Sequence, residues 1–164
     1  MKKLEITTTL TVFDSLDELP TEVRELMVKA VNVRKNAYAP YSKFRVGAAL
    51  VLENDEVVVG NNQENAVFPS GLCAERVAIY QAGALYPNIS IKMMAISASS
   101  DAFNVLTPTP PCGACRQSMF EYEENQKAHI ALYFMGETGK VVKVYDVVNK
   151  RHVFDYNNIA LGGE

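Results

Sequence analysis

The chain has 164 residues, enough for one ordinary domain, and its 48% hydrophobic and 21% charged residues are typical of a globular protein. The formal net charge is −3 and the basic residues are scattered, so we expect no nucleic-acid partner. The sequence has no apolar run of about 18 residues and no signal-like N-terminal stretch, which predicts a cytoplasmic protein without a membrane partner.

The N-terminal region begins with an alternating segment. Residues 4–12, LEITTTLTV, have period-two patterning and predict a short edge strand or arm. Ser15 and Glu18 have the spacing of a capping box, which favours a helical turn. From Thr21 to about Ala37 the apolar residues follow helical spacing and predict an amphipathic helix that packs on the core.

Strands and helices then alternate along the chain. In order we expect strands 45–53 and 57–62, a helix over 73–84, a strand over 91–99, a helix of about a dozen residues from Cys112, and strands 129–135 and 140–148. Asn54-Asp55 is a hairpin turn signal between the first two strands. This order predicts an α/β fold whose sheet is covered on both faces.

The chain has only three cysteines, an odd number that argues against a disulfide framework in a reducing compartment. Cys112 and Cys115 form a CxxC pair, and Cys73 is the remaining thiol. A closed structural zinc site uses four protein ligands, whereas three ligands leave a position open for water. The cysteines therefore predict a zinc site of the hydrolytic kind.

Two charged residues follow Cys73 at the start of the predicted helix. Glu75 can face a water on the metal and act as general acid and base, although alone it would be an ordinary first-turn glutamate. Three thiolates and Zn²⁺ carry a formal charge of −1, which the positive ends of two helices would offset. Arg76 lies one turn away, and we expect it to tune the zinc site through hydrogen bonds to sulfur rather than to contact substrate.

The motif CAE followed by PCGAC is the zinc deaminase signature. With NAYAPYSKFRVGAAL (36–50), NNQENAVFPSGLCAER (61–76) and PCGACRQ (111–117), the chain resembles the homotetrameric, Cys₃-zinc cytidine deaminase family over roughly residues 22–145. The resemblance implies a three-layer α-β-α fold with a mixed five-stranded sheet. It also implies a homotetramer with sites near subunit interfaces.

The resemblance further implies one Zn²⁺ per chain, held by Cys73, Cys112 and Cys115. Glu75 would carry protons while hydroxide attacks C4 of the base. Cytidine or 2′-deoxycytidine would yield the corresponding uridine and ammonia, a step of pyrimidine salvage.

Four further residues match substrate contacts of this family. The resemblance assigns the Ala74 backbone to the base edge and Phe44 to the face of the pyrimidine. It assigns Asn62 and Glu64 to the ribose hydroxyls. Without it, Phe44 would be a core residue, and the two polar side chains would simply face water. In this superfamily, a cysteine at position 73 rather than a histidine is typical of enzymes that act on free nucleosides.

The boundaries of the resemblance predict a single cytidine-deaminase-like domain. It divides into an N-terminal arm (1–19), a family core (about 22–145) and a divergent tail (146–164). Phe68 stands where family members often carry a tyrosine that reaches a neighbouring subunit. Phe154 is the candidate in the tail for a second aromatic residue of that kind.

Two other interpretations remain open. A blasticidin S deaminase would share the zinc motifs and the hydrolysis but take an antibiotic as substrate. A zinc-stabilised binding module or a CxxC thiol switch would not be an enzyme of this kind. Substitution of Cys73 separates these classes, because a thiol switch would keep its Cys112/Cys115 pair.

Overall fold

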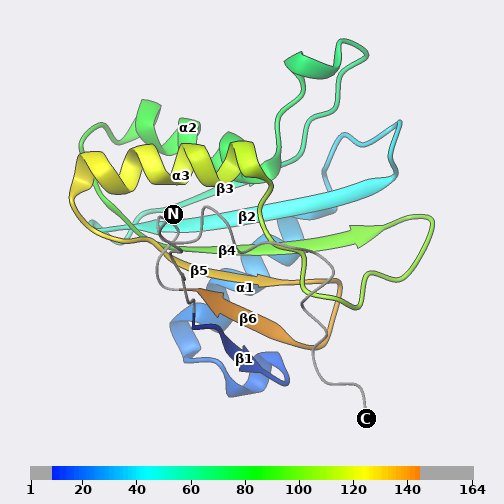
Figure 1. The fold of residues 1–164 in the computed structure, drawn as a ribbon, viewed down its shortest axis with the longest axis horizontal. Helices are drawn as coiled ribbons and strands as arrows, with labels where there is room; N and C mark the ends of the chain where they lie inside the picture. Colours follow the sequence, from blue (N-terminus) through cyan, green and yellow to red (C-terminus); the bar gives the residue numbers. More distant parts are fainter. Residues whose placement is uncertain (1–8, 145–164) are drawn as a thin grey trace, which may run out of the picture.

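The structure is a computed structural model that describes residues 9–144. The described residues form three α-helices, six strands and two short 3₁₀ helices (Figure 1). In chain order the elements are β1 (Thr11–Phe13), η1 (Leu16–Glu18), α1 (Thr21–Arg34), β2 (Phe44–Leu52), β3 (Val57–Asn61), η2 (Phe68–Ser70), α2 (Ala74–Leu85), β4 (Ile91–Ser100), α3 (Gly113–Gln126), β5 (Ala131–Met135) and β6 (Val141–Val144).

One mixed sheet carries the fold, in the strand order β1-β6-β5-β4-β2-β3. Only β4 and β5 are parallel neighbours among the described strands, and the other pairs are antiparallel. The mixed sheet is as expected, but the predicted count of five strands is wrong. The sixth strand is β1, which pairs antiparallel with β6 from Thr11 opposite Lys143 to Phe13 opposite Val141. The N-terminal arm therefore extends the sheet at the β6 edge.

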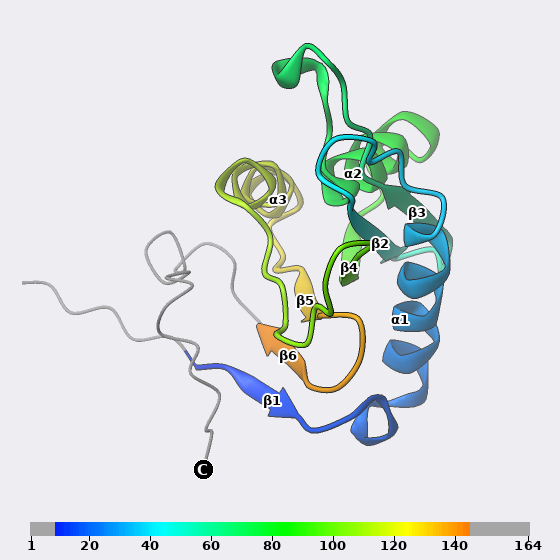
Figure 2. The ribbon, with the colours of Figure 1, turned by 90° about the vertical axis from the view of Figure 1, so that its right-hand side faces the viewer.

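Helices cover both faces of the sheet, which confirms the three-layer prediction. Figure 2 shows α1 on one face and α3 on the other, with α2 beside α3. Successive residues of β2 point to opposite faces: Ala48 and Leu50 pack with the α2 and α3 side, and Ala49 packs with α1. All three are fully buried, so both layers exclude water from the sheet.

The predicted helices and strands begin and end close to the observed ones, with one clear exception. The helix expected to reach Ala37 ends at Arg34, because the amides of Lys35 and Asn36 bond to carbonyls only three residues back. The helical turn expected at Ser15 and Glu18 forms as η1, where the Ser15 hydroxyl accepts a hydrogen bond from the Asp17 amide.

Three predictions fall wholly or partly outside the described residues, namely the tail with Phe154, the first part of strand 4–12 and the end of strand 140–148. Within residues 9–144, no helix is long and apolar enough to cross a membrane.

The N-terminus of α2 rests directly on β3. At Gly60, a Cβ atom would lie 2.5 Å from the carbonyl oxygen of Ala74 and 2.6 Å from the amide nitrogen of Ala78. Only glycine permits so close an approach between strand and helix. This contact fixes where the first turn of α2 begins.

Candidate zinc-dependent active site

The three cysteines lie together at the N-termini of two helices. Cys73 is the N-cap residue of α2, Cys112 is the N-cap residue of α3, and Cys115 lies in the first turn of α3. The Sγ atoms of Cys73 and Cys112 are 3.8 Å apart, and those of Cys112 and Cys115 are 3.4 Å apart. All three sulfurs lie within 4.8 Å of one another.

These sulfurs fit a zinc ion. Zinc binds thiolates at about 2.3 Å in tetrahedral geometry, which places two ligand sulfurs roughly 3.8 Å apart. The observed separations of 3.8 and 3.4 Å agree with that requirement. In the described part of the chain, this is the one such cluster of histidine, cysteine and acidic side chains. Three protein ligands leave the fourth position to water or substrate.

The surroundings of Cys73 favour its thiolate form. A hydrogen bond from the Cys115 thiol lowers the pKa of Cys73 to about 5, against the opposing effect of burial. That hydrogen bond, together with burial, raises the pKa of Cys115. Arg76 adds to the effect on Cys73, since its Nη2 atom lies 3.9 Å from the Cys73 sulfur. Arg76 thus lies beside the Cys73 sulfur, and its tuning of a zinc ion stays a prediction.

Glu75 is buried in the first turn of α2, with only 5% of its surface exposed. Burial and, to a smaller extent, the negative charge of Cys73 together raise the pKa of Glu75 to about 7. A side-chain hydrogen bond with Cys115 has the opposite effect and places the Glu75 carboxyl at the sulfur cluster. A proton acceptor and donor of nearly neutral pKa therefore adjoins the candidate metal site.

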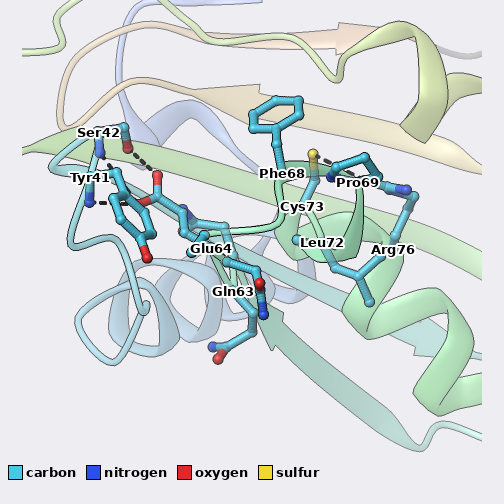
Figure 3. Close-up of a pocket in the computed structure, with 13 residues that line it drawn as sticks. Tyr41, Ser42, Gln63, Glu64, Phe68, Pro69, Leu72, Cys73 and Arg76 are labelled. Carbon is cyan, nitrogen blue, oxygen red and sulfur yellow. Dashed lines mark hydrogen bonds between the residues drawn. The ribbon is translucent and has the colours of Figure 1, made fainter.

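A cavity of about 690 Å³ opens beside Cys73 and Arg76. Asn62 and Glu64 line it, together with parts of the loop before α2 (Figure 3). Glu64 points toward residues 41 and 42 in this view: its carboxylate accepts hydrogen bonds from the Tyr41 amide at 2.9 Å, from the Ser42 amide at 3.3 Å and from the Ser42 hydroxyl. These bonds outweigh the effect of burial and lower the pKa of Glu64.

The Asn62 side chain is hydrogen-bonded to the backbone of Phe44. The Asn62 side-chain nitrogen Nδ2 donates a hydrogen bond to the Phe44 carbonyl at 2.9 Å. The Asn62 side-chain oxygen Oδ1 accepts one from the Val46 backbone amide at 2.8 Å. Asn62 therefore secures the start of β2 as well as lining the cavity. Neither Phe44 nor the fully buried Ala74 is among the described residues that line this cavity.

The sequence did not indicate a role for three residues near the site. Ser42 bonds Glu64 and also accepts a hydrogen bond from the Phe44 amide at 3.0 Å. Phe103 stacks on Phe44 from a loop far along the chain. Gly60 admits the first turn of α2. The position of Ser42, two residues before Phe44, could have indicated its hydrogen bond to the Phe44 amide. The contact between Phe103 and Phe44 could not be predicted, because it joins distant segments and leaves no local pattern in the sequence.

Comparison with known proteins agrees with this geometry. Residues 20–131 match the family described as "Cytidine and deoxycytidylate deaminase zinc-binding region". The cytidine deaminase of Halalkalibacterium halodurans is 42% identical over 99 residues, which cover 60% of this chain and 70% of that protein. That of Sporosarcina psychrophila is 39% identical over 101 residues, covering 62% and 70% respectively.

Solved structures give the same result. The crystal structure of cytidine deaminase from Burkholderia pseudomallei superposes with a TM-score of 0.65 at 34% identity, covering 77% of this chain and 93% of that chain. The cytidine deaminase of Mycobacterium leprae superposes with a TM-score of 0.58 at 26% identity, covering 83% and 100%. With its three clustered thiols and the family match over most of its length, the chain belongs to the zinc-binding cytidine and deoxycytidylate deaminase family.

Proposed function

We propose that this protein is a zinc-dependent hydrolase that converts cytidine and 2′-deoxycytidine to uridine and 2′-deoxyuridine, releasing ammonia, in pyrimidine salvage. The observation that carries the proposal is the buried Glu75 carboxyl, hydrogen-bonded within a cluster of three zinc-binding sulfurs. The relatives named cytidine deaminase support the same reaction.

Cys73, Cys112 and Cys115 would hold one zinc ion, which when bound makes water a stronger acid and so supplies a nucleophile at neutral pH. Glu75 accepts one proton of the attacking water and delivers it to N3 of the base. It then carries the second proton, from the new hydroxyl group at C4, to the amino group, which leaves as ammonia. A pKa of about 7 suits a group that must both accept and donate. We assign the Ala74 backbone to the base edge and Phe44 to the pyrimidine face.

The polar wall of the cavity favours a nucleoside over a nucleotide. Asn62 and Glu64 are proposed to bind the ribose hydroxyls, because both line the cavity that also contains Cys73. A carboxylate at this position would repel a phosphate, as would the chain's net charge of −3. Arg76 is already directed at the Cys73 sulfur and is proposed to moderate the charge of the zinc site.

We further propose a homotetramer in the cytosol. The loop between β3 and α2 projects from the body of the domain (Figure 1). It contains η2, in which Phe68 is 90% exposed. The adjacent Val67 is 62% exposed as well, and a group of exposed apolar side chains is typical of a surface that a partner covers. A reducing compartment would keep the three free cysteines available as metal ligands.

The test is to purify the full chain, measure zinc per chain and follow the ultraviolet band of cytidine as it shifts to that of uridine. Parallel assays use 2′-deoxycytidine, deoxycytidylate and blasticidin S. About one zinc per chain with turnover of both nucleosides supports the proposal. A zinc-loaded protein that turns over only deoxycytidylate or only blasticidin S contradicts it, and size measurement in solution tests the tetramer.

A further inference from the structure

Phe103 lies on the loop between β4 and α3 and stacks against Phe44. The two ring centroids are 6.4 Å apart, and the ring planes are inclined by 30°. Aromatic pairs at this separation attract each other beyond simple area burial. Phe103 is nevertheless 60% exposed, so core packing does not explain its presence.

The loop is held on both sides of Phe103. Before it, the Asp101 carboxylate accepts hydrogen bonds from the Arg45 Nε and Nη2 atoms, the shortest at 2.9 Å. The Asp101 amide also donates to the Lys43 carbonyl at 2.9 Å. After it, the Val105 carbonyl accepts from the Glu137 amide at 2.6 Å. Phe103 therefore lies between two residues, Asp101 and Val105, whose positions are fixed by hydrogen bonds.

The Phe44 backbone is joined to both residues that we assign to the ribose. Its carbonyl accepts from the Asn62 side chain at 2.9 Å. Its amide donates to the Ser42 hydroxyl at 3.0 Å, and that hydroxyl bonds the Glu64 carboxylate. The backbone that carries the Phe44 ring is thus fixed relative to the side chains of Asn62 and Glu64.

A ring at the start of a strand still has rotational freedom about its side-chain bonds. Stacking on Phe103 restricts the orientation of the Phe44 ring before substrate arrives. A preoriented contact surface strengthens binding because less conformational entropy is lost when the ligand binds.

We propose that Phe103 is a positioning residue for the pyrimidine, which acts by fixing the face that Phe44 presents to the base. The inference rests on the proposed function, since it requires Phe44 to contact a nucleobase. It adds a residue outside the zinc motifs that determines how tightly the nucleoside binds.

The experiment compares steady-state kinetics of the zinc-loaded full chain and its variants with cytidine. Phe103→Ala should raise KM about two- to tenfold, the range expected for loss of an aromatic pair, with kcat and zinc content unchanged. Phe103→Leu should behave alike, and Phe103→Tyr should restore the parent KM. Leu106→Ala is the matched control, because Leu106 is 65% exposed on the same loop, and its KM should not change.

A double-mutant cycle tests whether Phe103 acts through Phe44. In the Phe44→Leu background, Phe103→Ala should cause no further rise in KM. Asp101→Ala, which releases the loop from Arg45, should raise KM in the same direction as Phe103→Ala.

An unchanged KM in Phe103→Ala, or an equal effect with and without Phe44, overturns the inference and leaves the proposed function intact. A matching loss of kcat and thermal stability that Phe103→Tyr does not rescue also overturns it. Failure of the zinc-loaded parent chain to turn over cytidine instead contradicts the proposed function.

Discussion

Helix α2 sets the position of Glu75, and the surroundings of its carboxyl group raise its pKa. The first turn of α2 directs its carboxyl toward Cys115, and burial raises its pKa to about 7. An exposed first-turn glutamate, with an ordinary pKa of about 4, would be a weaker acceptor for the proton of the attacking water. The same side chain that looks ordinary in sequence is therefore unusual in its environment.

Glu75→Gln removes the proton carrier while keeping the shape of the side chain. We expect kcat to fall by about 10²–10⁴-fold, the usual range for a general acid–base residue, with zinc content unchanged. Cytidine turnover and metal analysis measure the two effects. Glu121→Gln, on the exposed face of α3, is the control. Activity near that of the parent chain would remove Glu75 from the chemistry.

Arg76→Gln removes the positive charge beside Cys73 but leaves the three sulfurs in place. We expect activity to fall while zinc remains bound, because more negative charge on the sulfurs makes zinc a weaker Lewis acid. Arg76→Lys, which keeps the charge, should lose less activity. Metal analysis alongside the assay checks this role, and complete loss of zinc would contradict it.

At the scale of elements, local pattern predicted most of the molecule. The helices α2 and α3 begin directly after their N-cap residues Cys73 and Cys112, at the two loop-to-helix junctions that the sequence predicts, so the cysteine cluster could be expected. Period-two patterning in residues 4–12 predicted an edge strand or arm, but it could not identify β6 as the partner of β1, because this pairing joins segments far apart in the sequence. The contact of Phe44 with Phe103 likewise depends on tertiary structure.

Gly60→Ala tests the contact between β3 and α2. The added methyl group would overlap the Ala74 carbonyl oxygen, so the N-terminus of α2 must shift away from β3. We expect a loss of about 1–3 kcal/mol in the free energy of unfolding and weaker zinc binding. Thermal unfolding and zinc titration measure both.

The control is Val59→Ala, since Val59 is the adjacent residue of β3 and its side chain is partly exposed. It should change stability little and zinc affinity not at all. If Gly60→Ala bound zinc as tightly as the parent chain, the first turn of α2 would not depend on this contact.

At the scale of the whole molecule, the zinc site connects segments that the chain keeps apart. Cys73 lies before β4, and Cys112 and Cys115 lie after it, at the ends of two helices on one face of the sheet. Farther along, the same helices meet where the Tyr80 and Ser118 hydroxyls lie 3.0 Å apart. A metal ion bound at the N-termini of α2 and α3 therefore adds a cross-link between two helices that otherwise meet through side-chain contacts.

Removal of zinc should destabilise the folded chain. A ligand present at about 1,000 times its Kd stabilises by about 4 kcal/mol, which for this chain length corresponds to roughly 10 °C in Tm. Calorimetry with and without a chelator measures the shift, and added zinc should reverse it. Cys112→Ser/Cys115→Ser should show no response to the chelator. An unchanged Tm in the parent chain would contradict a metal link between the helices.

The hydrogen bonds of Glu64 limit what it can offer a sugar. An ionised carboxylate has about four lone-pair positions, and residues 41 and 42 occupy three of them. One acceptor position remains, enough for a single hydroxyl group. In the proposed binding mode, a nucleoside that lacks the hydroxyl group bound by Glu64 should therefore bind more weakly than its parent.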